Sequence, residues 1–582
     1  MRKSLRREGP GARKLAGRPS SLAIAAILLG LLGNHVAAAT QSPDVGEATM
    51  PADGLAAGLQ ASLQPLVAVD APAHNDMQSM AMVYAARDWQ PIWTGSADAL
   101  ARGQLVVERL AAADREGLDP EDYGVSQIAA LAAKADMASL VERETLISAA
   151  LIRYARDVHT GRLRSTMNGF DIPLSTLPFE AGGFLTAAST VPDLASLLDA
   201  LPPALPAYAR LRTLLASLSA KSGEHWTPVP NVGKVAPGAV SAMIPALRQR
   251  LTQSGDFKGE LAGSTYDPPL VEAMKHFQAR HGLNNDGVIG AQTYAALGDG
   301  TGSRLREIKV NMERLRHFDP DPSGPYFVVN IPDYRLQLIT PDEATGKPVV
   351  AYEQHVVVGT AKDQTPTFSA DMSYIEFNPN WHVPKSIAIK EMLPKIRADP
   401  GYLERNSYLL LSGGQPVNPW LVDWSQVNAQ NFPYRVRQTP GGQNALGQMK
   451  FMFPNSYNVY IHDTPSKALF ARQRRSFSHG CIRLMKPMEL ADLLLQPQGW
   501  SDAMIHSVLD AGRTRVVTLK QAIPVHIIYL TAWVDENGKP QFREDLYDRD
   551  EVLATRLEAR RGRLLELPGA PTEAHAQQQS PT

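Results

Sequence analysis

The chain contains the stretch Ser478-His479-Gly480-Cys481-Ile482-Arg483-Leu484, in which Cys481 is the only cysteine of the sequence. A second histidine precedes it in the segment Tyr460-Ile461-His462-Asp463. The reactive form of cysteine is the thiolate, which is favoured by nearby bases, cations and backbone N–H groups. A free cysteine can also be a small buried hydrophobic residue. The two histidines and the Gly480-Cys481 step favour a thiol nucleophile over that structural interpretation.

Outward from this stretch, short apolar runs alternate with turn residues. The runs that predict strands cover 327–331, 335–339, 355–359, 449–453 and 458–462. His462 then ends a strand, and Cys481 lies on a loop before the segment 487–495, which has a helical pattern. Catalytic groups are often held at strand ends and on adjoining loops, so both side chains can reach one cleft. The pattern predicts a β-rich domain over residues 325–535.

Two helical units precede the β-rich domain. Residues 77–230 carry apolar residues at spacings of three and four, with charges on the other face, which predicts a helical scaffold domain. Residues 232–298 form a smaller unit, in which helical segments alternate with glycine-containing turns. A chain of 582 residues is expected to divide into several cores. The predicted fold class is therefore a multidomain α+β protein.

The first residues have the pattern of an export signal. Basic residues precede the apolar run 22–32 and the small residues Ala37-Ala38-Ala39, which suit signal peptidase. We interpret 1–39 as a signal peptide or, because the basic region is long, as an N-terminal anchor in the inner membrane. The mature chain would lie in the periplasm, where a lone cysteine has no disulfide partner within the chain. Residues 40–76 are interpreted as a linker and the tail 560–582 as disordered.

Composition excludes several classes of function. The formal net charge is −1, so no overall field attracts nucleic acid. A single cysteine cannot build a cysteine-based metal site, and the sequence has neither a phosphate-binding glycine loop nor a dinucleotide fingerprint. We therefore expect no metal, no cofactor and no nucleic-acid partner.

The unit 232–298 resembles the small three-helix peptidoglycan-binding domain of many wall enzymes. The residues that carry the resemblance are Phe277-Gln278 and Asp286-Gly287-Val288-Ile289-Gly290. Phe277 and Ile289 are expected in the core of the unit. The resemblance implies peptidoglycan as a partner.

The β-rich domain resembles the catalytic domain of bacterial L,D-transpeptidases. That family carries a histidine, a spacer, and then Ser/Thr-His-Gly-Cys with a nearby Arg or Asn. The matching residues are His462, Ser478, His479, Gly480, Cys481 and Arg483, and Gly359-Thr360 and Thr365-Pro366 also fit the pattern. The insertion 386–440 is too long for an ordinary connection, and with the helical units it resembles the large multidomain branch of the family. In that branch an inserted subdomain caps the active site, and the insertion's aromatic residues are expected to present apolar surface to a peptide: Trp420, Trp424, Phe432 and Tyr434.

The resemblance implies a peptidoglycan peptide stem as the donor. Cys481 would attack the carbonyl on the L-centre of diaminopimelate and expel D-alanine, leaving a thioester. His462 is expected to take the thiol proton, with its other nitrogen oriented by the backbone carbonyl of Asp463; a side-chain pair with Asp463 is the less favoured variant. His479 could instead bind or polarise the carbonyl, so the roles of the two histidines stay open at this stage.

Further residues of the motif region are expected to bind substrate or to hold the loop. The N–H groups of Gly480 and Cys481, together with Tyr460, are candidates for stabilising the oxyanion. Arg483 is interpreted either as a fork for a substrate carboxylate or as half of a structural ion pair. Trp381 either lines the donor cleft or packs as an ordinary aromatic residue. Ser478 is expected to fix the loop rather than to react.

The acceptor decides which reaction results. A second, amine-bearing stem would give a diaminopimelate–diaminopimelate cross-link, with a role in cell-wall biogenesis and cell shape and with other wall-synthesis enzymes as possible partners. Water would make the enzyme an L,D-carboxypeptidase, and a lipoprotein lysine would make it an enzyme that attaches proteins to the wall. A wall-binding scaffold with a decayed site is the non-enzymatic alternative, and the intact Cys481 and His462 argue against it.

Overall fold

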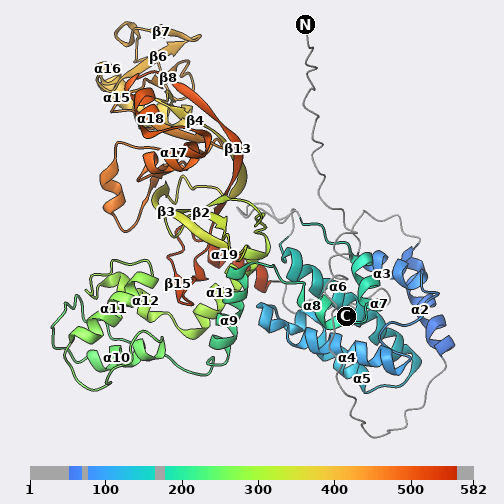
Figure 1. Cartoon of the computed structure of the whole chain (residues 1–582). Helices are drawn as coiled ribbons and strands as arrows, with labels where there is room; N and C mark the ends of the chain where they lie inside the picture. The colour runs from blue at the N-terminus through green and yellow to red at the C-terminus, as the bar shows by residue number, and fades with distance from the viewer. Residues whose placement is uncertain (1–51, 68–75, 164–176, 560–582) are drawn as a thin grey trace, which may run out of the picture.

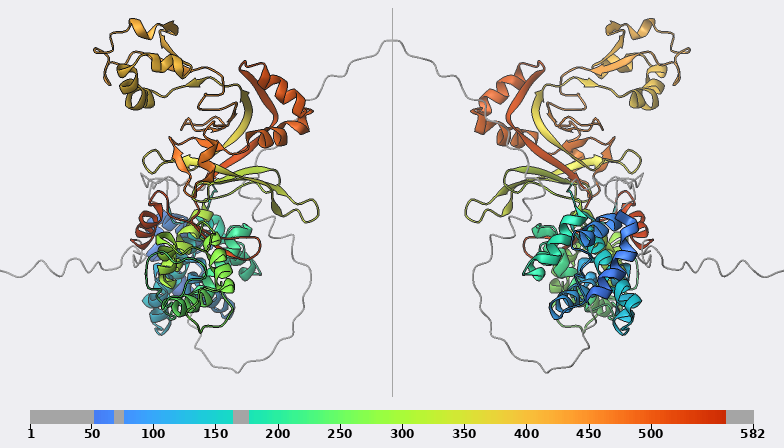
Figure 2. Two further views of the ribbon diagram at one scale, coloured as in Figure 1. Left: turned by 90° about the vertical axis from the view of Figure 1, so that its left-hand side faces the viewer. Right: turned by 90° about the vertical axis from the view of Figure 1, so that its right-hand side faces the viewer.

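The computed structural model describes residues 52–67, 76–163 and 177–559. The predicted signal peptide or anchor at 1–39 and the predicted tail at 560–582 lie outside these residues. Within the described ranges, no helix is both long enough and apolar enough to cross a membrane. The β-rich part stands above two helical units (Figure 1), and the side views keep this separation (Figure 2). The prediction of a multidomain α+β fold is confirmed.

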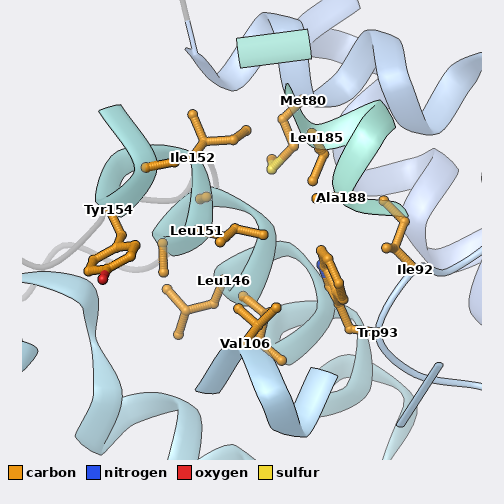
Figure 3. Packing of buried hydrophobic residues seen from close by; sticks show 14 of the residues in the cluster. Met80, Ile92, Trp93, Val106, Leu146, Leu151, Ile152, Tyr154, Leu185 and Ala188 are labelled. Carbon is orange, nitrogen blue, oxygen red and sulfur yellow. The ribbon is translucent and has the colours of Figure 1, made fainter. Parts of the chain in front are cut away.

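The N-terminal helical unit packs around a long helix, α6 (Met137–Thr160). Asp136 caps this helix by accepting a hydrogen bond from the Ser139 N–H at 3.0 Å. Figure 3 shows Leu146, Leu151 and Ile152 of α6 packed among side chains of the neighbouring elements. Those elements are α2 (Ala52–Val67), α3 (Asp76–Ala85), α4 (Ala97–Ala111), α5 (Val125–Ala132), α7 (Ala181–Thr190) and α8 (Leu194–Asp199). The unit is held by the apolar stripes that these helices turn toward α6.

The prediction of a linker over 40–76 is wrong for residues 52–67, which form α2. Leu55, Leu59 and Leu63 recur every four residues and are at most 4% exposed in the scaffold core. A spacing of four places these side chains on one face of a helix. Many Ala and Gly residues lie between the leucines, and they weaken the contrast between the two faces. The scaffold therefore includes residues before the predicted boundary at 77.

The smaller helical unit consists of α10 (Ile244–Gln253), α11 (Pro268–Arg280) and α12 (Ala291–Gly298). Phe277 and Ile289 are fully buried in its core. The Gln278 side chain donates to the Val288 carbonyl and accepts from the Gly287 N–H, both at 2.9 Å. This pair of bonds fixes the glycine-containing turn against α11, which explains why Gln278 belongs to the motif.

Helix α13 (Thr301–Arg316) links the two helical units to the β-rich domain. It packs against α9 (Pro206–Ser219) of the scaffold and against α19 (Arg549–Glu558) near the end of the described chain. The hairpin of β14 (Ala532–Val534) and β15 (Pro540–Phe542) adds to the same junction. The chain thus returns to the helical units after the sheet of the β-rich domain.

The β-rich domain is built on a mixed sheet with the order β11-β3-β12-β10-β9-β4-β13-β1-β2. β3 pairs with β2 through its first part and with β12 and β11 through its last residues, so the sheet closes on itself. Helices α17 (Pro487–Leu495) and α18 (Asp502–Asp510) contribute to its core. The strands are β1 (Tyr326–Asn330), β2 (Arg335–Pro341), β3 (Pro348–Gly359), β4 (Phe368–Phe377), β9 (Met449–Met452), β10 (Ile461–His462), β11 (Ser476–Ser478), β12 (Ile482–Leu484) and β13 (Arg515–Ile528).

The insertion between β4 and β9 forms a subdomain with its own small sheet and its own apolar core. The sheet has the order β5-β8-β6-β7, and Figure 1 shows β6, β7, α15 and α16 at the far end of the molecule. Its elements are β5 (Trp381–His382), α14 (Lys385–Ile387), a π-helical turn (Ala388–Met392), α15 (Leu393–Ala398), α16 (Gly401–Arg405), β6 (Tyr408–Ser412), β7 (Gln415–Val417) and β8 (Arg435–Gln438).

The aromatic residues of the insertion do not act as a group on its surface. Trp424 is 7% exposed and Phe432 is 3% exposed, because both pack in the subdomain's own core. Trp420, at 60% exposure, is the member of the set that presents a large apolar face. The expectation that these residues jointly meet a peptide is therefore wrong for Trp424 and Phe432, which stabilise the subdomain instead.

Candidate active site

Strand register places the motif residues on one face of the sheet. One row across β12, β10, β9 and β4 is apolar and buried in the core: Ile482, Ile461, Phe451 and Ile375. The adjacent row is polar: Arg483, His462, Lys450 and Glu376. Successive residues of a strand point to opposite faces, so the polar row lies on the face away from the core. Tyr460 precedes His462 by two positions and Cys481 precedes Arg483 by two, so they belong to this polar face.

The nucleophile loop between β11 and β12 is held by its own hydrogen bonds. Ser478 Oγ donates to the Cys481 carbonyl at 2.5 Å and accepts from the Gly480 N–H at 3.1 Å. Ser478 is buried, as expected for a residue that fixes the loop. Because the Gly480 N–H is engaged within the loop, the oxyanion donors left from the predicted set are the Cys481 N–H and the Tyr460 hydroxyl. Gly480 has φ +108°, a conformation that favours glycine.

The loop that follows β3 is hydrogen-bonded to the nucleophile loop and supports it. Thr365 Oγ1 donates to the Gly480 carbonyl at 2.8 Å and accepts from the Gly359 N–H at 2.9 Å. The Tyr547 hydroxyl donates to the Gly359 carbonyl at 2.8 Å and accepts from the Thr365 N–H at 3.2 Å. The Gly359-Thr360 and Thr365-Pro366 motifs therefore position the loop that carries Cys481. Tyr547 lies far along the chain, and no local pattern marked it.

Cys481 is a free thiol that is half-buried beside Tyr460. Burial raises the pKa of the Cys481 thiol, while hydrogen bonds from the Tyr460 backbone and hydroxyl act to lower it. The sulfur lies 4.0 Å from the Asn458 carbonyl. The thiol is therefore protonated at neutral pH and needs a base when it attacks.

His462 is suited to be that base. It is 4% exposed, and its Nδ1 lies 2.5 Å from the backbone carbonyl of Asp463. This contact makes Nδ1 the donor and leaves Nε2 as the proton acceptor. Burial lowers the pKa of His462 to about 3, with the charge of Arg483 adding to the decrease. His462 is therefore neutral in the resting protein.

The Asp463 carboxylate points to other partners. It accepts from Lys467 Nζ at 2.7 Å and from the Gln448 N–H at 2.9 Å. The contact between Asp463 and His462 is thus made by the backbone carbonyl, the arrangement favoured from the sequence, and the carboxylate holds the loop that follows β10.

His479 lies on the open side of the loop and contacts the inserted subdomain. Its Nε2 lies 2.5 Å from Glu391 Oε1, and its side chain is 42% exposed. Glu391 belongs to the π-helical turn Ala388–Met392, and such turns often occur at functional sites. His479 therefore joins the nucleophile loop to the insertion, and this connection was not visible in the sequence.

The remaining predicted residues surround the thiol. Among the described residues no carboxylate lies within ion-pairing distance of Arg483, and its Nε is buried without a hydrogen-bond partner. This favours the substrate-carboxylate interpretation of Arg483 over the structural ion pair. Trp381 interacts with the Tyr460 hydroxyl, and its ring centre lies 6.3 Å from that of Tyr408 in a tilted arrangement, so Trp381 lies where the insertion meets the site.

Sequence reasoning missed two members of the polar row. Lys450 Nζ lies 4.1 Å from the centre of the Tyr460 ring and 3.8 Å from the Glu376 carboxylate. Its charge helps to lower the pKa of His462 and partly offsets the increase that burial causes in the pKa of Cys481. Lys450 and Glu376 sit on separate strands with no motif around them, and strand register is what places them in the site.

Three segments of the chain match models of known protein families. Residues 324–518 match the family model of the L,D-transpeptidase catalytic domain, residues 241–297 that of a peptidoglycan-binding domain, and residues 78–215 that of a scaffold domain. A Haemophilus influenzae protein named "Putative L,D-transpeptidase" is 37% identical over 249 residues, which is 43% of this chain. The chain spans about half the length of that relative, 49%. The resemblance to L,D-transpeptidases with a peptidoglycan-binding domain is thereby confirmed.

Solved structures resemble this chain only weakly. An L,D-transpeptidase crystal structure from Xylanimonas cellulosilytica is 15% identical, with a TM-score of 0.14, and the match covers 51% of this chain and 98% of that one. A fused amidase, peptidase and peptidoglycan-binding protein from Clostridium acetobutylicum is 10% identical, with a TM-score of 0.15, covering 50% and 98%. Scores this low support no argument about this fold.

Proposed function

We propose that this protein cross-links peptidoglycan by transferring an acyl group from a donor stem through a thioester on Cys481. The observation that carries the proposal is the placement of Cys481 and His462 on one polar face of adjacent parallel strands. A neutral thiol, a neutral imidazole with a fixed tautomer, and a hydroxyl beside the sulfur form a set suited to acyl transfer.

The first half of the reaction uses the donor stem. The Cys481 sulfur attacks the carbonyl on the L-centre of diaminopimelate while its proton passes to Nε2 of His462. The oxyanion lies against the Cys481 N–H and the Tyr460 hydroxyl. As the carbon–nitrogen bond breaks, His462 returns the proton to the amine of the departing D-alanine, and the thioester remains.

The second half consumes the thioester. The side-chain amine of a diaminopimelate in a second stem attacks the thioester carbonyl, a new amide bond forms, and the carbon–sulfur bond breaks. The proton lost by the amine returns to the sulfur through His462. We place this activity in the periplasm, where peptidoglycan lies, with the peptidoglycan-binding domain holding the enzyme on its substrate.

The contact between His479 and Glu391 supports a cap role for the insertion. A subdomain held against the nucleophile loop would keep water from the thioester until the acceptor amine arrives. This role favours cross-linking over hydrolysis, and attachment of a protein to the wall remains the other acyl transfer open to the same site.

The test is the variant Cys481→Ala with purified tetrapeptide stems. We expect a folded protein that forms no cross-linked dimer, because the reacting sulfur is gone. Incubation of the unaltered protein with a carbapenem should give a covalent adduct that peptide mass spectrometry maps to Cys481. Cross-links formed by the alanine variant would refute the proposal, and release of D-alanine without dimer formation by the unaltered protein would assign it instead as an L,D-carboxypeptidase.

A further inference from the structure

A cavity of about 620 Å³ lies where the peptidoglycan-binding unit, the catalytic domain and the β14–β15 hairpin meet. None of the active-site residues described above lines this interdomain cavity, so the cavity is distinct from the site at Cys481. Its volume falls in the range of small-ligand sites, about 300–1,000 Å³. Figure 1 shows the elements around it, with α11 and α12 on one side, β2 and β3 on another, and β15 between them.

The three parts that form the cavity are fixed to one another around its wall. Arg543 donates to the Arg280 carbonyl at 3.0 Å and to Asp333 at 2.7 Å, joining all three. The ring of His281 stacks on Phe542 at 5.4 Å. Gln473 donates to the Gly282 carbonyl at 3.4 Å. The cavity is therefore a built feature of the folded chain, with polar groups from separate domains facing one space.

The lining of the cavity carries an excess of positive charge. Among the described residues, the arginines that line it are Arg304, Arg335, Arg474, Arg475 and Arg543, and the carboxylates are Asp299, Asp333 and Glu544. Each of these carboxylates already has an arginine: Asp299 pairs with Arg304 at 2.6 Å, and Asp333 pairs with Arg543 at 2.7 Å. Glu544 lies 3.6 Å from Arg474.

Arg475 is the arginine left without a carboxylate. Among the described residues none lies within ion-pairing distance of it, and its Nε is buried with no hydrogen-bond partner. One terminal nitrogen donates to the Arg472 carbonyl at 3.1 Å, and the guanidinium lies 5.1 Å from the Tyr334 ring centre. A planar guanidinium with open donors is the group that proteins use to bind a carboxylate in a two-point fork.

Amide side chains complete the wall. Asn284, Asn285, Gln292 and Gln473 line the cavity, and amides bind peptide groups and sugar hydroxyls through donor and acceptor atoms together. A site with surplus guanidinium groups and several amides suits a hydrophilic peptide that bears free carboxylates. The peptide stem of peptidoglycan has this chemistry.

We propose that the interdomain cavity is a second binding site for a peptidoglycan peptide stem, held through its carboxylates by Arg475 and Arg474. The identity of the ligand rests on the proposed function, whereas the cavity and its charge do not. The site lets one chain hold a second part of the wall while Cys481 works on the donor. Arg475 immediately precedes β11, the strand that leads into the nucleophile loop, so the two sites flank one short segment.

The test measures binding stoichiometry in the full chain with Cys481→Ala, which prevents turnover. Isothermal titration with a purified disaccharide-tetrapeptide should give two stems per chain. Adding Arg474→Gln and Arg475→Gln should remove one of them or weaken it by roughly tenfold to a hundredfold, since charge-assisted hydrogen bonds are lost. Arg472→Gln is the matched control, because Arg472 is exposed, lies in the same segment and does not line the cavity.

Three further measurements keep the result decisive. Asn285→Asp, at an exposed position of the wall, should weaken the same site without disturbing the fold. A stem whose carboxylates are amidated should not bind there. Carbapenem acylation of chains that keep Cys481 should be unaffected by all three arginine changes, so failure of the catalytic proposal would be seen separately. Retention of two stems by the Arg474→Gln, Arg475→Gln variant would overturn the proposal, as would equal binding of the amidated stem. Tetraglutamate is a peptide with several carboxylates that is not a wall stem. Its binding to the cavity, where the stem does not bind, would also overturn the proposal.

Discussion

Cys481 and His462 rest as a neutral pair. Burial raises the pKa of the thiol above its ordinary value of 9.0, and burial lowers the pKa of His462 from 6.5 to about 3. A preformed thiolate–imidazolium pair would require the opposite shifts, with the pKa of the thiol lowered and that of the imidazole raised. In the proposed reaction the proton therefore moves during attack. The neutral resting thiol resists oxidation, because oxidation follows thiolate character.

The neutral pair predicts the pH dependence of Cys481 alkylation. Because the pKa of the thiol is raised, the thiolate fraction at neutral pH is small, and it grows with every unit by which the pH approaches that pKa. The rate of modification by iodoacetamide should thus increase steadily between about pH 6 and about pH 9. Rates followed by mass spectrometry across this interval check the prediction. A plateau below pH 7, with thiolate absorbance already present, would contradict it.

Much of the site at this scale could be predicted from the sequence, because the motif is local. Ser478, Gly480 and Cys481 lie within one loop, and the carbonyl that orients His462 belongs to the next residue. Lys450, Glu391 and Tyr547 could not be predicted in the same way. They reach the site through strand register or through folding of distant segments, and no spacing rule in the sequence encodes those contacts.

At the scale of elements, the loop after β3 works as a support for the nucleophile loop. Thr365→Val keeps the shape of the side chain but removes the hydroxyl, so the Gly480 carbonyl and the Gly359 N–H both lose a partner. Leaving buried polar groups unpaired costs about 1–3 kcal/mol each. We expect lower stability in urea and a fall in carbapenem acylation of roughly tenfold to a hundredfold, because small displacements of a nucleophile are costly.

The control for this change is Thr213→Val on α9, whose hydroxyl bonds the Ala209 carbonyl on an exposed helix face. It should leave both stability and acylation nearly unaltered. Normal acylation by a folded Thr365→Val protein would show that the brace does not position Cys481.

The insertion is coupled to the nucleophile loop through a contact between His479 and Glu391 that one substitution can weaken. Glu391→Gln keeps the size of the side chain and weakens its interaction with His479. A half-exposed polar contact of this kind contributes about 0.2–1 kcal/mol, so cross-linking of stems should fall by about twofold to fivefold. Reaction of Cys481 with iodoacetamide should not change. Glu404→Gln, on α16 of the same subdomain, is the control and should behave like the unaltered protein. Equal cross-linking by both variants would contradict a cap held through Glu391.

Element prediction succeeded where periodicity was strong and failed where side chains were small. The helix expected at 487–495 is α17, with the same bounds, and the strand pattern before His462 is shortened to β10 because Asn458 takes a left-handed conformation at φ +56°. α2 was missed because alanine and glycine fill the faces between its leucines. The length of the insertion indicated a separate structural element, but its own apolar core could not be predicted. The sequence does not distinguish aromatic residues that pack inside a subdomain from those that face a ligand.

For the molecule as a whole, α13 is the element on which the units meet. It contacts α9 of the scaffold, the β14–β15 hairpin and α19, so the catalytic sheet, the scaffold and the end of the described chain share one helix. The contact with the scaffold combines apolar packing against α9 with buried hydrogen bonds to Glu313. Glu313 accepts hydrogen bonds from the Arg162 and Leu163 N–H groups at 2.6 and 3.0 Å and from Arg316 at 2.9 Å. These bonds join segments that are about 150 residues apart in the chain.

Glu313 should therefore be required for the scaffold to stay docked. Burial acts to raise its pKa, but His317 and Arg316 lower it more, so the net pKa lies well below the ordinary 4.5. A carboxyl group with a depressed pKa in the folded state stabilises the protein above about pH 4.5, and this contribution is lost as the pH falls below that value.

Glu313→Gln removes the charge and leaves the buried Arg316 guanidinium without its carboxylate, which costs about 3–5 kcal/mol. Calorimetry should show a lower unfolding temperature for the variant near neutral pH, and a smaller loss of stability on acidification than in the unaltered protein. Glu536→Gln, in the exposed β14–β15 turn, should shift neither quantity. If Glu313→Gln unfolds at the same temperature as this control, the Glu313 carboxylate does not hold the scaffold to α13, and the apolar packing of α9 must stabilise that junction alone.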